Sequence, residues 1–117
     1  MEKLPKVNNL REAVEEVIKN NQREGYPPNR FRNMTRVHNN ELPSVCRSLV
    51  NSRDALSYLF DALRSYPNLL TIEDFIAHYG EQWGLKDVVE EANKRVQLYD
   101  EIAQKTAIFY LKRFGMN

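Results

Sequence analysis

The chain has few of the residues that mark disulfide scaffolds, metalloproteins and phosphate-binding loops. Its 117 residues include one cysteine, two histidines and four glycines. Because Cys46 has no second cysteine to pair with, an intramolecular disulfide is excluded and a reducing cytoplasmic location is favoured. His38, His78 and Cys46 lie too far apart for paired metal-ligand spacing, and every glycine stands alone. We therefore expect no metal and no cofactor.

Long apolar runs and a charge excess are missing as well. No stretch of about 18 apolar residues occurs, so no membrane-spanning helix is predicted, and no basic-then-apolar leader indicates secretion. The formal net charge is only +1, which gives no overall field to attract nucleic acid or a membrane. Any electrostatic binding must therefore come from a local patch.

Length and hydrophobic spacing together predict the architecture. A chain of this length can bury one core without staples, so we expect residues 1–117 to form a single helical domain, with residues 1–8 as a loose N-terminal segment. Apolar residues recur at spacings of three and four, and no alternating strand pattern occurs. The predicted fold class is all-α, a compact bundle of about five short helices packed on one long C-terminal helix.

Capping residues indicate where the short helices start. Asn9 with Glu12, and Thr71 with Asp74, have the spacing of a capping box, in which side chains and backbone NH groups satisfy each other. The expected starts of the short helices, in chain order, are Asn9, Asn29, Leu42, Asn51 or Ser52, and Thr71.

The longest helical pattern runs from Leu85 to Arg113 without a proline or glycine. Acid-before-base pairs four residues apart, including Glu91 with Arg95, should support its solvent face. From about Leu98 onward apolar residues cover more than half of the circumference, so a second neighbour is implied. That neighbour is either a further helix of the same chain or the same helix of a second copy. The candidate dimer-interface residues are Leu98, Ile102, Ile108 and Phe109.

A local basic patch surrounds the second predicted helix. Its candidate binding residues are Arg23, Arg30, Arg32, Asn33 and Arg36. Phe31, Met34 and Val37 should face inward and turn the patch outward. Arg and Asn side chains can read purine edges, and this helix with the next one resembles a helix-turn-helix in its lengths. Three interpretations stay open: nucleic-acid contact, an acidic protein partner, or a solvated face balanced by internal acids.

Residues 32–38, with the sequence RNMTRVH, have the form Arg, polar residue, four residues, His. This segment resembles the active-site motif of HEPN ribonucleases, all-α domains in which an Arg and a His meet across a dimer interface and cleave RNA. The resemblance implies catalytic roles for Arg32 and His38, without a metal. It covers seven residues in the first third of the chain, whereas the family's motif usually falls late in the domain.

A broader pattern joins Tyr-x-Pro-x-x-Phe-x-x-Met at residues 26–34, Leu-Thr-Ile-Glu-Asp at residues 70–74, then Trp83 and a helix with Tyr99. This order is similar to that of a small helical domain seen in uncharacterised bacterial proteins, over about two thirds of the chain. The resemblance implies a compact helical fold and a bacterial or phage origin, and it transfers no activity.

These patterns predict a small cytoplasmic protein, a homodimer through the long helix, that acts as a non-enzymatic accessory or protein-interaction module. The first alternative is a nucleic-acid-binding protein that uses the basic patch. A HEPN-like ribonuclease is the more distant alternative. No membrane partner is expected.

Overall fold

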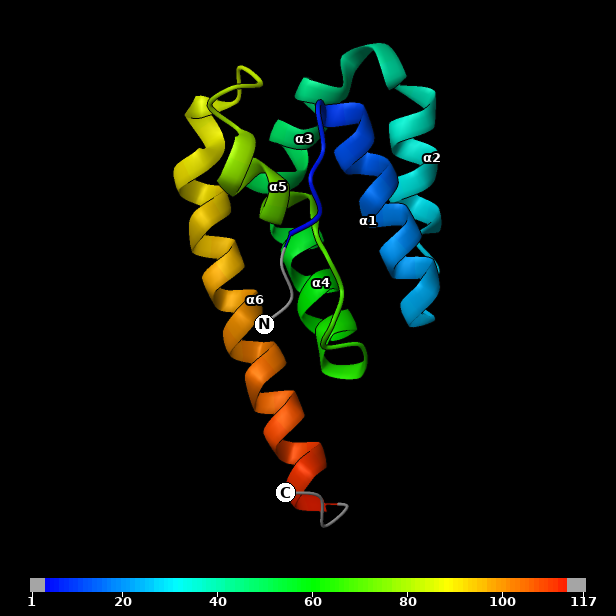
Figure 1. Cartoon of the computed structure of the whole chain (residues 1–117), viewed down its shortest axis with the longest axis vertical. Coiled ribbons are helices and arrows are strands. Elements are labelled where there is room, and N and C mark those ends of the chain that lie inside the picture. Colours follow the sequence, from blue (N-terminus) through cyan, green and yellow to red (C-terminus); the bar gives the residue numbers. More distant parts are fainter. Residues whose placement is uncertain (1–3, 114–117) are drawn as a thin grey trace.

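The computed structural model describes the backbone of residues 4–113 and the side chains of residues 4–106. All regular structure in that part is helical, which confirms the all-α class (Figure 1). The elements are α1 (Leu10–Glu24), α2 (Asn29–Val37), the 3-10 turn η1 (Asn39–Glu41), α3 (Leu42–Asn51), α4 (Arg53–Ser65), α5 (Ile72–Tyr79) and α6 (Lys86–Arg113).

Helix α6 is unbroken and forms one long side of the molecule, as predicted (Figure 1). Its 28 residues, at ~1.5 Å each, give a rod of about 40 Å along a molecule whose longest extent is 48 Å. Helices α3, α4 and α5 pack directly on it. Helices α1 and α2 pack mainly on α3 and α5, so they form a second layer away from α6.

Three of the predicted caps are present, whereas Asn29, predicted to cap the second helix, is the first residue of α2 and its side chain accepts from Arg32 Nη2 instead of a backbone NH. The Asn9 side chain accepts a hydrogen bond from the backbone NH of Glu12 at 3.0 Å. Thr71 and Asp74 form a complete capping box, in which each side chain accepts from the other residue's backbone NH. Ser52, one of the two candidates, caps α4 through a hydrogen bond from the backbone NH of Ala55 at 3.1 Å.

The core consists of two clusters. The larger lies between α1, α3, α5 and the start of α6, and includes Val14, Phe75 and Leu85. The smaller surrounds Leu63 of α4 and Tyr99 of α6. Residues 4–9 form no helix, and Val7 of this segment is buried in the larger cluster.

Helix α2 buries a different face from the one predicted. Val37, expected to point inward, has 70% of its surface exposed, whereas Thr35 is fully buried. Thr35 tolerates burial because its hydroxyl donates back to the carbonyl oxygen of Phe31, at 2.8 Å, one helical turn earlier. Val37 is the last residue of α2, where the chain turns into η1 and no helix covers it.

Helix α6 also differs from its prediction at one position. Arg95 was expected on the solvent face with Glu91, but only 4% of its surface is exposed. The buried stripe of α6 runs through Val88, Ala92, Arg95 and Tyr99 and continues from the buried Leu85 just before the helix. A cation therefore lies in the middle of the apolar face of the helix.

Candidate functional site

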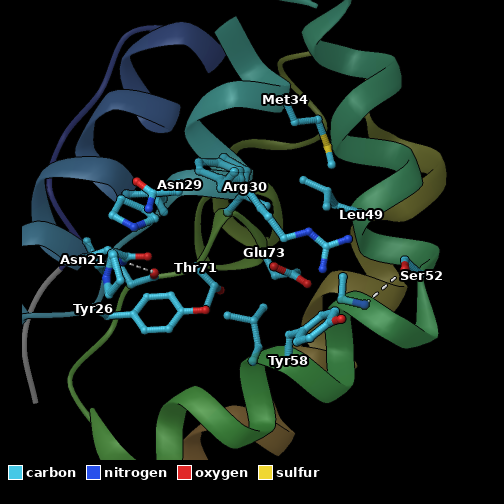
Figure 2. Close-up of a pocket in the computed structure, with 18 of the residues that line it drawn as sticks. Asn21, Tyr26, Asn29, Arg30, Met34, Leu49, Ser52, Tyr58, Thr71 and Glu73 are labelled. Atoms are coloured by element: carbon cyan, nitrogen blue, oxygen red, sulfur yellow. Dashed lines mark hydrogen bonds between the residues drawn. The ribbon is translucent and has the colours of Figure 1, made fainter. Parts of the chain in front are cut away.

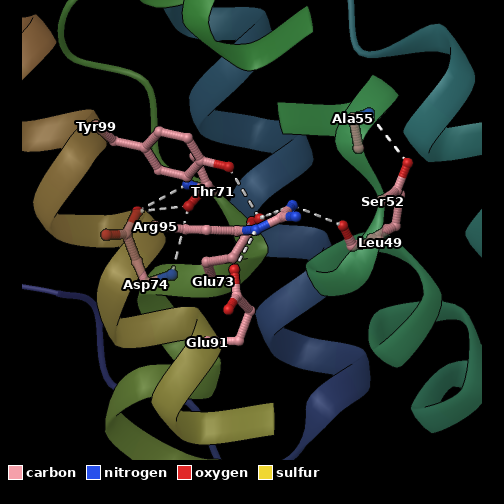
Figure 3. A network of polar contacts seen from close by, with 9 residues as sticks. All are labelled: Leu49, Ser52, Ala55, Thr71, Glu73, Asp74, Glu91, Arg95 and Tyr99. Carbon is pink, nitrogen blue, oxygen red and sulfur yellow. Dashed lines mark hydrogen bonds and ion pairs between the residues drawn. The ribbon is translucent and has the colours of Figure 1, made fainter. Parts of the chain in front are cut away.

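A buried polar network joins α5 to α6 around Glu73, of which 1% is exposed (Figure 3). The Tyr99 hydroxyl donates a hydrogen bond of 2.9 Å to Glu73 Oε2. Arg95 Nη1 lies 3.7 Å from the same oxygen. Two positions of the α6 stripe thus converge on one carboxyl group of α5, because residues four apart on a helix lie on the same side.

Arg95 connects three helices. Its Nη1 donates to the carbonyl oxygen of Leu49 in α3 at 3.0 Å, and its Nε donates to Glu91 Oε2 at 3.3 Å. The guanidinium therefore has partners on α3, on α5 and on its own helix (Figure 3). A buried cation with partners on several sides is stabilised, whereas loss of one partner leaves an uncompensated charge.

Burial dominates the proton equilibria of this region. Desolvation raises the pKa of Glu73, although a contact with its own backbone, the Tyr99 hydroxyl and the charge of Arg95 all oppose that rise. Burial and the nearby Glu73 charge also raise the pKa of Tyr99. Cys46 is fully buried, and its pKa is raised by burial and by Glu73 to about 12. Its thiol therefore remains protonated at neutral pH and is not a nucleophile.

A pocket of about 390 Å³ opens next to this network, between α2 and α4 (Figure 2). The segment from Leu70 to Glu73, which leads into α5, forms part of its wall. Most of the lining side chains are apolar, among them Tyr26, Phe31, Met34, Leu49, Tyr58 and Leu59. Glu73 belongs to both features, because its carboxyl group is held by α6 on one side and lines the pocket on the other.

Arg30 and Tyr58 face each other at the rim of the pocket. The guanidinium carbon of Arg30 lies 4.8 Å from the centre of the Tyr58 ring, a cation–π contact from α2 to α4. Both residues are exposed. Among the described residues Arg30 forms no ion pair, so this ring is the partner that the structure assigns to it.

The predicted basic patch is divided by the fold. Arg32, Asn33 and Arg36 are exposed along one side of α2, and Arg32 Nη2 donates to Asn29 Oδ1 at 2.9 Å. Arg23 is exposed at the end of α1. Arg30 belongs instead to the pocket rim, because it points toward α4 (Figure 2).

The helix-turn-helix comparison finds little support in α3. A recognition helix needs long polar side chains that reach base edges. The exposed residues of α3 are Pro43, Ser44, Ser48 and Asn51. Its one basic residue, Arg47, donates to Asp87 Oδ2 at 2.9 Å and to the carbonyl oxygen of Gly84 at 2.7 Å.

The two residues of the ribonuclease-like motif are both exposed. Arg32 lies on α2, and His38 is the residue that ends this helix. Six residues along a helix turn through about 600°, which places two such side chains about 120° apart. Arg32 and His38 therefore do not share a face of α2. A joint site would need a second copy of the chain.

The four predicted interface residues differ in their surroundings. Leu98 has 41% of its surface exposed. Ile102 is half-buried and packs against the smaller core cluster with Tyr99. The side chains of Ile108 and Phe109 lie outside the described residues, although α6 continues to Arg113.

Neither the pocket nor the buried network was predicted. Glu73 lies inside the predicted capping box, but its side chain takes no part in that box, which Thr71 and Asp74 form. Arg95 was interpreted as solvent-facing because Glu91 precedes it by four residues, although it also lies three residues after Ala92 and four before Tyr99. The position of Arg95 in line with Ala92 and Tyr99 was the one sequence signal that Arg95 would be buried and would face an acidic side chain.

Within residues 4–113 no helix is both long and apolar enough to span a membrane. No group of three or more metal-ligating side chains occurs in the same part of the chain. The chain matches no protein-family model, no curated protein and no solved structure.

Proposed function

We propose that the protein is a non-enzymatic interaction module that self-associates through the C-terminal part of α6. The observation that carries the proposal is that α6 extends beyond the ends of the other helices (Figure 1), and that Leu98 on the same helix has 41% of its surface exposed. The sequence of the extension contains Ile108 and Phe109, which a second copy would cover together with Leu98 and the exposed part of the half-buried Ile102.

Helix stability supports this interpretation. An isolated helical segment shorter than about 12–15 residues is marginal in water, because most helical stability in proteins comes from packing of an apolar face. The protruding part of α6 is such a segment. The same part of a second chain would pack against it as an antiparallel helix pair. Apolar residues at spacings of three and four would form the contact between the two helices, which we call the seam.

Light scattering after size-exclusion chromatography tests the proposal. Wild-type protein should be dimeric at concentrations of tens of micromolar, roughly the range for a modest interface. Phe109→Glu should give monomers, because a charge would be buried in the seam. Gln97→Glu, which adds the same charge at an exposed position of α6, should leave the dimer intact. Monomeric wild-type protein would refute the proposal.

Nucleic-acid binding is the second candidate, favoured by the exposure of Arg32, Asn33 and Arg36 along one side of α2. Fluorescence anisotropy with short RNA and DNA should then show an affinity that falls steeply with salt. The double variant Arg32→Ala, Arg36→Ala should bind more weakly at every salt concentration. Unchanged affinity in this variant would exclude the outer face of α2.

The ribonuclease alternative has a separate test. RNA incubated with the protein and a metal chelator should be cleaved by the wild type and remain intact with His38→Ala. If RNA survives prolonged incubation with wild-type protein, His38 has no such catalytic role.

A further inference from the structure

We propose that the pocket between α2 and α4 binds a small organic ammonium compound with an apolar body, and that the buried carboxyl group of Glu73 holds its cationic group. This site is independent of self-association, because it lies on the side of the molecule away from the free end of α6 (Figure 1).

The size and walls of the pocket suit such a ligand. Its volume of about 390 Å³ falls in the range of about 300–1,000 Å³ that is typical of small-molecule sites. Tyr26 and Phe31 supply aromatic surface from the α2 side, and Leu59 and Tyr58 supply apolar surface from α4. Small-molecule sites commonly combine such walls with a few polar groups that fix the orientation of the ligand.

Glu73 supplies the polar group. Both of its contacts with α6, from Tyr99 and from Arg95, are made by Oε2. Its other oxygen, Oε1, takes part in neither, and the carboxyl group lies at the back of the pocket (Figure 2). An ammonium group can donate to Oε1 without displacing either partner of Oε2. A charge-assisted hydrogen bond of this kind is stronger than a neutral one, more so away from water.

The rim shows that an aromatic wall of the pocket accepts a cation. The Arg30 guanidinium already lies over the Tyr58 ring, where the electron-rich face of the ring attracts positive charge. Arg30 is exposed and can turn toward solvent when a ligand enters. The charged groups that line the pocket are Arg30, Asp54 and Glu73, and Glu73 is the one of the three that is buried. Arg95 balances part of the Glu73 charge through Oε2, so the preference of the pocket interior for a cation over an anion rests on Oε1 of the same carboxyl group.

Titrations followed by NMR chemical shifts of the backbone amides test the proposal with three probes of similar shape. These are 2-phenylethylammonium, the neutral 3-phenylpropan-1-ol and the anion 3-phenylpropionate. The ammonium probe should shift amides of the pocket lining and bind about tenfold more tightly than the alcohol. The anion should bind most weakly, because Glu73 repels it.

Three variants place the binding in this pocket. Ala55→Phe should abolish binding of the ammonium probe, because Ala55 lines the pocket and a larger side chain would fill it. Ser57→Phe adds the same side chain at an exposed position of α4 that does not line the pocket, and should bind as the wild type does. Glu73→Gln should remove the preference for the ammonium probe over the alcohol.

Circular dichroism shows whether Glu73→Gln is folded. If it is not, the probe series and the Ala55→Phe and Ser57→Phe pair still decide the question. The proposal is overturned if the ammonium probe causes no shifts up to about 10 mM, roughly the weak limit for a ligand of this size. It is also overturned if the anion binds more tightly than the ammonium probe and Arg30→Ala weakens the anion, which would indicate an anion site at the rim.

Discussion

The two halves of α6 lie in different environments. The first half, from Lys86 to Tyr99, is covered by α3, α4 and α5 and carries a buried ion pair. The second half extends beyond the neighbouring helices (Figure 1), and Leu98, shortly before it, is partly exposed. A charged Arg95 is thus buried while an apolar Leu98, three residues later, is half exposed. The burial of a residue on a helix depends mainly on whether a neighbouring helix covers it, and only secondarily on the polarity of its own side chain.

The largest expected effect comes from breaking the ion pair in the covered half. Arg95→Ala should lower the free energy of unfolding by about 3–5 kcal/mol, because Glu73 would remain buried without its cation. Urea denaturation measures this change. Lys94→Ala removes the neighbouring cation, whose contact with Glu90 is exposed, and should change stability by less than about 0.5 kcal/mol. Similar losses in both variants would show that burial of Arg95 contributes nothing.

The close packing of α5 on the covered half gives the next largest effect. A Cβ atom at Gly80 would meet the carbonyl oxygen of Ile76 and would lie 2.7 Å from Val89 Cγ2 of α6. Gly80→Ala should therefore destabilise the protein by about 1–3 kcal/mol through overpacking. Thermal denaturation tests this, and the double variant Gly80→Ala, Val89→Ala should recover part of the loss. A stabilised single variant would mean that α5 moves freely relative to α6.

The pH dependence of stability isolates Glu73 itself. Its pKa in the folded protein is raised above the ordinary value of 4.5, so the folded state binds more protons than the unfolded state between these two values. The contribution of this group to stability is full below pH 4.5 and is lost as pH rises through the folded pKa. Denaturation at a series of pH values should show this decline in the wild type. Glu73→Gln should lack it, and identical slopes in the two proteins would contradict the raised pKa.

The smallest effect is expected at Leu98, which is an exposed residue of α6. Leu98→Ser should change the unfolding free energy of the monomer by only about 0.5 kcal/mol, as is usual for exposed positions. The same substitution should weaken self-association if the proposed seam exists. Denaturation and sedimentation measured on the same samples separate the two effects. A large loss of monomer stability would place Leu98 inside the fold.

Much of the fold could be predicted because helix formation depends on residues close in sequence. Asn9, Ser52 and Thr71 cap their helices through hydrogen bonds to residues three positions later, so the pattern and the bond lie in the same few residues. The long α6 follows from an uninterrupted apolar spacing. The error at Val37 has the same origin, since spacing predicts which residues share a face but not where the covering neighbour ends.

The candidate site could be predicted only in fragments. Arg30 was singled out as a basic residue in the first turn of α2, but its position over Tyr58 depends on how α2 and α4 approach each other. Arg95 was predicted in a surface pair with Glu91, and that pair is present. The contacts of Arg95 with Glu73 and with Leu49 join residues more than twenty positions apart, beyond the range of any local pattern.

The sequence by itself determined the helical class, the starts of the capped helices and the single long C-terminal helix, because these follow from hydrogen bonds and apolar spacing within a few residues. Only the tertiary structure decided that Arg95 and Glu73 are buried together and that Glu73 also lines a pocket. The physical reason is that burial removes water from a group only when distant segments, here α3, α5 and α6, close around it.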